Sequence, residues 1–435
     1  MTPPRPHATL VVRNALVATC DAGPSDAGPS DAGLVPCGAV AVEDRLVAWV
    51  GPDAALAGAV DLEHAEVIDA GGRLVTPGLV DSHTHLVFAG DRSGELAQRA
   101  RGLDYGAIAR AGGGIASTVR ATRAASREEL LASAIGRARR LLAEGITTCE
   151  VKSGYGLSVE HELRLLEVID ELRHALFAEL TIVPTLLAAH AVPPEGDRAR
   201  WLAQIAGELV PEVARRRLAA FCDAFCEEVA FTRRECRDVL EAGLAHGLVP
   251  RLHADQLTGP DHPGAPPGGG ARLAAELGCA SADHLEHVSD DGIAALAAAG
   301  VVAGMLPATT LWLGQDRWAP ARRLLGGGVP LALATNLNPG SAPTASASLT
   351  FGLACARLGL SPEEALVAFT AGGARSLRLG DRGRLATGCE ADLVVWGCHD
   401  VAHLCGHPAA PHALRVVKRG RSVWEAPPGA AFDCP

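Results

Sequence analysis

The sequence predicts an α/β protein: a (β/α)8 barrel over residues 78–380, joined to a small β domain that both ends of the chain form together. Two observations support this fold class. Short apolar runs alternate with amphipathic stretches through the middle of the chain, which is typical of a parallel sheet covered by helices. Runs of β-branched residues separated by turn residues precede and follow that region. The length of 435 residues accommodates a barrel, which needs roughly 250, together with a second domain.

The N-terminal part of the β domain is expected over residues 1–77. Its strands are predicted within the runs 8–17, 38–50 and 66–77. Between the first two runs, near residues 21–33, the unit Asp-Ala-Gly-Pro-Ser repeats in tandem. This segment has almost nothing to bury and predicts a flexible surface loop.

The barrel is expected to begin at residue 78. Apolar runs such as ITTCEV, TIVPTLLAA and VPLALAT are candidate strands, and SREELLASAIGRARRLLAEG is a candidate helix. From residue 381 the pattern returns to β runs, in GRLATGCEADLVVWG and RVVKRGRSVWEA. Residues 381–435 are therefore predicted to pair with 1–77 in one small domain.

Composition excludes several classes of partner. The net charge is −11, with 20% charged and 48% hydrophobic residues, which is typical of a globular protein and disfavours nucleic acid as a partner. The chain has no run of 18 apolar residues, and its first residues lack the apolar core of a signal peptide. The twelve cysteines are scattered without a CxxC pair, which favours reduced thiols. We therefore expect a cytoplasmic protein that does not bind membranes.

The strongest chemical motif is His-Thr-His at the start of the barrel. Side chains alternate along a strand, so His83 and His85 point to one face. The motif lies at the end of the first expected barrel strand, where active-site residues of such barrels gather. His253 ends another apolar run and could supply the third nitrogen of a catalytic metal site. A lone histidine is more often a hydrogen-bonded core residue, but the pairing with His83 and His85 favours metal ligation.

Four further residues are candidates for substrate binding or proton transfer. His284 follows Asp283 at an expected strand end and could orient a substrate or move a proton. Arg92 could form a bidentate pair with a carboxylate, the alternative being a solvated loop residue. Tyr155 lies between glycines that let a loop approach a ligand, and His190 ends a strand run. For both, the alternative is a packed structural residue.

Several of these segments together resemble the imidazolonepropionases, a family of the amidohydrolase superfamily. The resemblance runs from about Gly71 to Gly380 through TPGLVDSHTHLVFAGDR, AGGGI, GITTCEVKSGYGL, TLLAAHAVPPE, RLHADQ, SADHLEH and NLNPGSAP. It implies the barrel, a β-sandwich-like domain from both termini, one zinc or iron ion, and a homodimer. It also implies a small anionic substrate, 4-imidazolone-5-propanoate, whose cyclic amide is hydrolysed to N-formimidoyl-L-glutamate in histidine degradation.

Carried over position by position, the resemblance makes His83, His85 and His253 metal ligands. The substrate contacts that it implies are Arg92, Tyr155, His190, Gln256, Asn338, Gly340 and Ser341. We expect His284 and Gln256 to be catalytic.

One position departs from the family pattern. At the last barrel strand, where the resemblance leads us to expect an aspartate that binds metal and shuttles protons, this chain has Asn336. We expect Asn336 to belong to the catalytic site as a weak metal ligand, with proton transfer passing to His284. Two alternatives are open. One is another amidohydrolase, such as a heterocycle deaminase, which needs no Arg92 to pair with a propionate. The other is a binding protein that lost catalysis through Asn336.

Overall fold

The computed structural model describes residues 5–21, 32–103, 108, 111–193, 196–259, 269–408, 410 and 412–427. The tandem repeat near 21–33, predicted as a flexible loop, lies largely outside the described residues.

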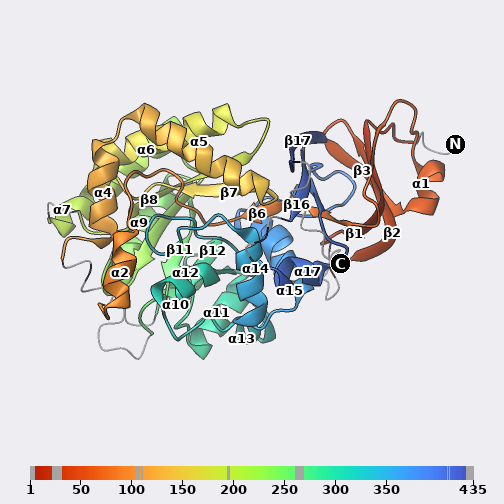
Figure 1. Cartoon of the computed structure of the whole chain (residues 1–435). Helices are drawn as coiled ribbons and strands as arrows, with labels where there is room; N and C mark the ends of the chain where they lie inside the picture. Colours follow the sequence, from red (N-terminus) through yellow and green to blue (C-terminus); the bar gives the residue numbers. More distant parts are fainter. Residues whose placement is uncertain are drawn as a thin grey trace.

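Eight parallel strands form the barrel, as the alternating pattern predicts (Figure 1). Neighbouring strands pair in chain order, and a short additional strand, β10 (Val249–Pro250), pairs with β9. The eight are β6 (Leu79–Asp81), β7 (Ile146–Lys152), β8 (Thr181–Ala189), β9 (Phe221–Cys226), β11 (Leu252–Ala254), β12 (Ser281–His284), β13 (Val302–Met305) and β14 (Leu331–Leu333). The predicted fold class is confirmed.

The barrel closes through the residues that follow its first and last strands. The Asn336 N–H donates to the carbonyl oxygen of His83 at 3.0 Å, and the His85 N–H donates to that of Leu337 at 2.9 Å. The Asp81 carboxylate accepts from both the N–H and the hydroxyl of Thr335. These bonds place the His-Thr-His segment beside the segment that carries Asn336.

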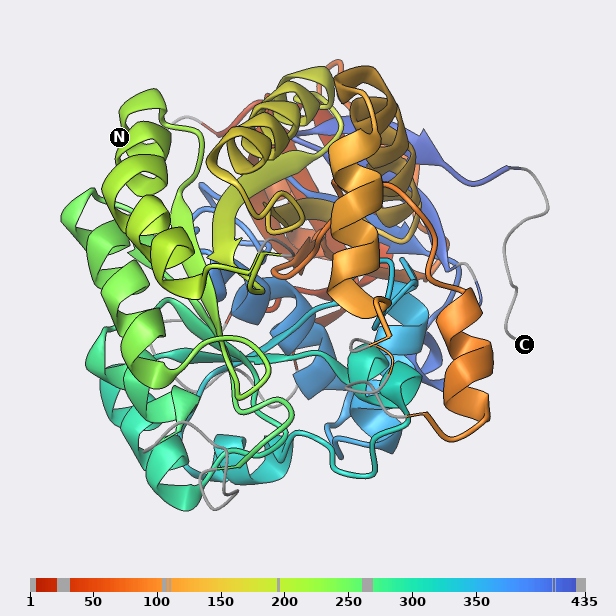
Figure 2. The same ribbon diagram turned by 90° about the vertical axis from the view of Figure 1, so that its left-hand side faces the viewer.

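Helices surround the strands in the view of Figure 2. The stretch predicted as a helix is α5 (Arg127–Ala143), which begins with a capping box formed by Ser126 and Glu129. Its buried residues include Leu130, Ala134, Ala138 and Leu141, whose spacing gives one apolar face. The other helices of this region are α2 (Gly94–Ala100), α4 (Gly114–Ala124), α6 (Val159–Ala175), α7 (Arg198–Gln204), α8 (Val210–Arg216), α9 (Arg233–Ala245), α10 (Gly270–Glu276), α11 (Asp290–Ala299), α12 (Pro307–Leu313), α13 (Ala321–Gly326), α14 (Ala347–Ala356), α15 (Pro362–Val367) and α16 (Gly373–Ser376). Within the described ranges, no helix is both long and apolar enough to cross a membrane.

The two ends of the chain meet in one sheet beside the barrel (Figure 1). Its order is β17-β16-β15-β5-β1-β2-β3, with β4 also paired to β1. β5 (Leu74–Pro77) pairs with β15 (Leu393–Trp396) and so joins the N-terminal strands to the C-terminal ones. The other elements are β1 (Leu10–Ala18), β2 (Leu34–Glu43), β3 (Leu46–Pro52), β4 (Glu66–Asp69), β16 (Ala413–Lys418), β17 (Arg421–Glu425), α1 (Asp53–Ala59) and α17 (Val401–Gly406).

Aliphatic side chains of both ends fill a separate core in this sheet domain. The run 38–50 spans two antiparallel strands, and Asp44 takes a φ of 55° at the turn between them. The domain boundaries at 77/78 and 380/381 stay predictions.

Candidate metal and substrate site

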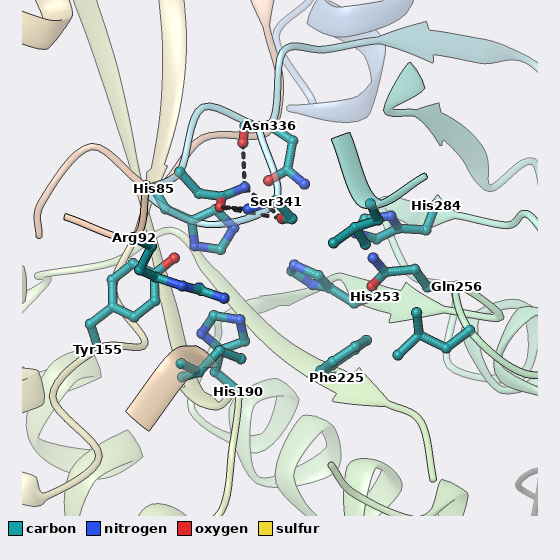
Figure 3. Close-up of a pocket in the computed structure, with 14 residues that line it drawn as sticks. His85, Arg92, Tyr155, His190, Phe225, His253, Gln256, His284, Asn336 and Ser341 are labelled. Carbon is teal, nitrogen blue, oxygen red and sulfur yellow. Dashed lines mark hydrogen bonds between the residues drawn. The ribbon is translucent and has the colours of Figure 1, made fainter. Parts of the chain in front are cut away.

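One pocket opens where the barrel strands end (Figure 3). It contains about 490 Å³ of empty space including its mouth, a size suited to a small molecule. Its lining consists of His85, Arg92, Ile115, Tyr155, His190, Phe225, His253, Gln256, Leu257, His284, Leu313, Asn336, Asn338 and Ser341. The structure therefore brings together in one pocket most of the residues that the sequence predicted for the site. His83 and Gly340 are not part of the lining: His83 contacts the ring of His253, and Gly340 contacts Arg92.

His83 and His85 follow β6 and are only 1% and 3% exposed. Nδ1 of His83 lies 2.8 Å from Asp283 Oδ2, and its Nε2 is buried with no hydrogen-bond partner among the described residues. A carboxylate at Nδ1 favours the tautomer that leaves a lone pair on Nε2. Burial lowers the pKa of both imidazoles well below the usual value, and the positive charge of Lys152 near His83 and the imidazole of His190 near His85 lower it further. Both rings are therefore neutral, the form that binds metals.

His253 of β11 and His284 of β12 extend this group of imidazoles. One nitrogen each of His83, His253 and His284 lie within 4.8 Å of one another, close enough to hold one ion. The ring centre of His85 is 5.4 Å from that of His83 and 5.9 Å from that of His253. The predicted triad and the triad with the closest nitrogens thus share His83 and His253. His284 has a φ of 83°, a left-handed conformation whose cost to a non-glycine residue is about 1–3 kcal/mol and which concentrates at functional sites.

Asn336 is held in the loop after β14 with a φ of 53°, which asparagine tolerates better than most residues. Its Nδ2 donates to the Thr309 hydroxyl at 2.8 Å, so its Oδ1 is buried and has no partner in the described part of the chain. Unpartnered lone pairs on His83 Nε2 and Asn336 Oδ1 form a nitrogen and oxygen donor set that suits a divalent ion. The residues present therefore fit the metal that the resemblance implies.

Five buried charged side chains in the barrel interior, here called the charged layer, were not predicted as a group. They are Glu150, Lys152, Asp223, Arg251 and Asp283, each at most 1% exposed. Lys152 Nζ donates to Glu150 at 2.6 Å and to Asp223 at 2.7 Å, and Arg251 donates to Asp283 at 3.1 Å. A signal was available in the sequence, because a charged residue within an apolar strand run is costly to bury unless it is paired.

Two carboxylates of the charged layer touch imidazoles. Asp283 contacts His83 as described, and Asp223 Oδ2 lies 3.1 Å from Nδ1 of His253. Burial alone raises the pKa of both carboxyls, but the charges of Lys152 and Arg251 hold the pKa of Asp283 below its usual value, and Lys152 does the same for Asp223. Both carboxyls are therefore ionised beneath the histidines.

Arg92, predicted to bind a carboxylate, already has one as a neighbour. Its Nε and Nη2 donate to Glu95 of α2 at 3.0 and 2.9 Å, and Glu95 also accepts from the Gly114 N–H at 2.7 Å. The guanidinium lines the pocket and packs against Gly340, where an added Cβ would lie 2.0 Å from Nη1. Arg92 is thus fixed in orientation while part of it faces the pocket.

A buried glutamate fixes the loop that carries Tyr155. Glu162 accepts from the backbone N–H groups of Gly154, Gly156 and Leu157. His190 joins this loop, because its Nδ1 lies 3.0 Å from the carbonyl oxygen of Gly154. Burial, together with the neighbouring imidazole of His253, lowers the pKa of His190 to about 3, so its ring is neutral.

The loops that carry Gln256 and Ser341 are fixed in the same way. Glu227 accepts from the Gln256 N–H at 2.6 Å. Asn338 Oδ1 accepts from the N–H groups of Gly340 and Ser341 at 2.9 and 2.8 Å, and its Nδ2 donates to Asn336 O at 2.7 Å. The polar atoms of Asn338 thus hold the turn, and its predicted contact with substrate stays a prediction.

Comparison with known proteins shows the family of this chain. The model of the amidohydrolase family matches residues 66–100 and 89–423. An imidazolonepropionase of Anaeromyxobacter dehalogenans (strain 2CP-1 / ATCC BAA-258) is 61% identical over 432 residues, covering 99% of both chains. Imidazolonepropionases of Myxococcus xanthus (strain DK1622) and Geobacillus kaustophilus (strain HTA426) are 50% and 45% identical, each covering 89% of this chain and 90% of the relative.

Solved structures agree with the fold. A 5-methylcytosine deaminase from Klebsiella pneumoniae, liganded with phosphonocytosine, superimposes with a TM-score of 0.73 at 14% identity, covering 96% of this chain and 98% of that one. An adenosine deaminase from Xanthomonas campestris with bound zinc gives a TM-score of 0.67 at 19% identity, covering 96% and 93%.

Proposed function

Because the chain belongs to the amidohydrolase family and, within it, to the imidazolonepropionases, we propose that it hydrolyses the cyclic amide of 4-imidazolone-5-propanoate to N-formimidoyl-L-glutamate, a step of L-histidine degradation. The observation that carries this proposal is a pocket lined by buried imidazoles and by a fixed guanidinium. The imidazoles suit metal-dependent hydrolysis, and the guanidinium suits the propionate of the substrate. A heterocycle deaminase would have no such use for Arg92.

We assign the ligands of one zinc or iron ion to His83, His85, His253 and Asn336. When bound, such an ion polarises a carbonyl oxygen and lowers the pKa of water toward about 7. The choice of His85 over His284 as the third imidazole follows from the reaction, since opening a lactam requires a group that is free to carry a proton. Nδ1 of His284 lies 3.7 Å from a carboxylate oxygen of Glu286, and the imidazole lines the pocket.

The remaining pocket residues bind and orient the substrate. Arg92 pairs with the propionate and sets the direction in which the ring enters. Tyr155 and His190, whose ring centres are 5.4 Å apart, contact each other and form one wall beside the substrate ring. Ser341 and the amide of Gln256 offer hydrogen bonds to its polar edge. Phe225, Leu257 and Leu313 add apolar walls that displace water.

Proton transfer falls to His284. As water adds to the lactam carbonyl, His284 Nε2 takes its proton, and the same imidazolium returns a proton to the ring nitrogen when the C–N bond breaks. The products are a carboxylate and the open formimidoyl group, so no other reactant is consumed. Asn336 cannot take this proton, because its amide has no basic site near neutral pH.

The test is direct. The purified protein is analysed for bound metals and incubated with 4-imidazolone-5-propanoate, and N-formimidoyl-L-glutamate is measured as product. Product formation that stops on removal of the metal and returns with zinc or iron is the expected result. Substrate binding without product would instead support the catalytically silent binding protein. We also propose a cytoplasmic homodimer, which light scattering and cell fractionation test separately.

A further inference from the structure

The ligands proposed for the ion carry no charge. They are three imidazoles and one amide oxygen, all buried. A divalent ion in such a site keeps its full charge, and a buried charge is stabilised only when groups of opposite charge lie near it. Negative charge must therefore come from residues that do not touch the ion.

The charged layer places that negative charge against the ligands. Asp283 Oδ2 is 2.8 Å from Nδ1 of His83, and Asp223 Oδ2 is 3.1 Å from Nδ1 of His253. These contacts engage the nitrogen on the side of each ring away from Nε2. A carboxylate in this position fixes the tautomer and raises the basicity of the other ring nitrogen.

Each of these carboxylates is also held by a cation. Arg251 donates to Asp283 at 3.1 Å and to the carbonyl oxygens of Ser82 and Ser376 at 2.9 Å each. Lys152 donates to Asp223 at 2.7 Å. In both cases the carboxylate lies between an imidazole and a buried cation, which keeps it next to the ring. The Asp283–His83 contact is a hydrogen bond, whereas Asp223 approaches His253 at ion-pair distance without hydrogen-bond geometry.

We propose that Asp283 and Asp223 are positioning residues. They belong to the charged layer of three carboxylates and two cations, whose net charge of −1 replaces the charge that Asn336 lacks, and they fix Nε2 of His83 and His253 toward the ion. This inference rests on the proposed metal-dependent function. It assigns Lys152 and Arg251 the task of holding the two carboxylates in place.

The experiment compares Asp283→Asn with the parent protein. Asparagine keeps the shape and one acceptor oxygen for His83 but removes the charge. Metal affinity is measured by competition with a chelator, and the visible spectrum of the Co²⁺-loaded protein reports the ligand geometry. We expect about 10- to 100-fold weaker metal binding and a changed spectrum. Asp392→Asn is the matched control, because Asp392 is also a buried carboxylate held by a buried cation, Lys418 at 2.6 Å, but it lies in the sheet domain and bonds to no imidazole that the structure describes. Its affinity should stay within about 3-fold of the parent.

A second substitution distinguishes charge from structural support. Adding Asn336→Asp to Asp283→Asn puts a negative charge directly on the ion, so the double variant should bind metal at least as tightly as the parent. A structural defect at position 283 would not be repaired from position 336. Unchanged affinity in Asp283→Asn, or a loss that Asn336→Asp does not restore, overturns the inference. If Asp283→Asn does not fold, Asp223→Asn gives the same test through His253. A parent protein that binds no metal would refute the proposed function instead.

Discussion

A methyl group added at Gly340 should disable Arg92 without removing it. The Cβ of an alanine at this position would lie 2.0 Å from Nη1, 2.1 Å from Cζ and 2.6 Å from Nη2 of Arg92. Gly340 does not have a positive φ, so alanine is compatible with its backbone. The whole effect of Gly340→Ala should therefore fall on the guanidinium.

The guanidinium of Arg92 cannot move away from the added methyl group without losing its orientation. Reaching ordinary van der Waals distance requires a shift of more than about 1 Å, and Arg92 is held by bonds of 3.0 and 2.9 Å to Glu95. A displacement of this size breaks at least one of them and moves the charge away from the propionate. Loss of a hydrogen bond to a charged group costs about 1.5–3 kcal/mol. We therefore expect kcat/KM for the imidazolone to fall by roughly 10- to 150-fold.

Steady-state kinetics of the parent and four variants test the role of Arg92. Gly94→Ala is the control, because a Cβ at Gly94 meets nothing within 4 Å although it precedes Glu95, and its kcat/KM should equal that of the parent. Arg92→Ala should lose activity in the same range as Gly340→Ala. The double variant should be no worse than Arg92→Ala, since the two changes remove one interaction. Unchanged kinetics in Gly340→Ala, or losses that multiply in the double variant, would refute the assigned role of Arg92.

Three further outcomes are expected. His85→Ala should lose stoichiometric metal whereas His284→Ala should keep the metal and lose kcat, as elemental analysis and kinetics would show; the reverse pattern would make His284 the ligand. Asn336→Asp should tighten metal binding and raise kcat. Adding His284→Ala should reduce kcat less in the Asn336→Asp variant than in the parent. If Asn336→Asp changes neither metal retention nor rate, Asn336 does not contact the ion. Burial raises the pKa of Glu144, which accepts from the Ala347 N–H at 2.9 Å. The folded state therefore binds this proton more tightly than the unfolded state, and stability from this group falls as pH rises from about 4 through the raised pKa. In urea unfolding, the free energy of unfolding of Glu144→Gln should therefore increase relative to that of the parent as pH rises. A difference between the two proteins that does not change with pH would contradict this prediction.

The parts of the site that follow from local geometry could be predicted from the sequence. The alternation of side chains along a strand indicates that His83 and His85 belong together, and the end of an apolar run indicates where His253 lies. The strand and helix alternation predicts the barrel, and the barrel predicts that these residues meet at one end.

The choice between His85 and His284 could not be made in this way. It depends on the backbone conformation at the ends of two strands. His284 has a left-handed φ of 83°, and no pattern of residue types in the sequence indicates this conformation. The partners of Arg92 were missed for a related reason. Glu95 is only three residues away, but the guanidinium also packs against Gly340, which lies on the loop after the last barrel strand, far from Arg92 in the sequence.

The contacts of the charged layer could not be predicted from the sequence for a different physical reason. His83 and Asp283 are 200 residues apart, and Arg251 is 32 residues from Asp283, so their contacts exist only once the barrel is closed. In the unfolded chain each of these charges is hydrated, and burying any of them alone would cost several kcal/mol. The barrel can bury all five because each carboxylate finds a cation or an imidazole. A charged residue in an apolar run therefore predicts that a partner exists but does not identify it. Only the closed barrel places the imidazole of a proposed metal ligand next to the carboxylate.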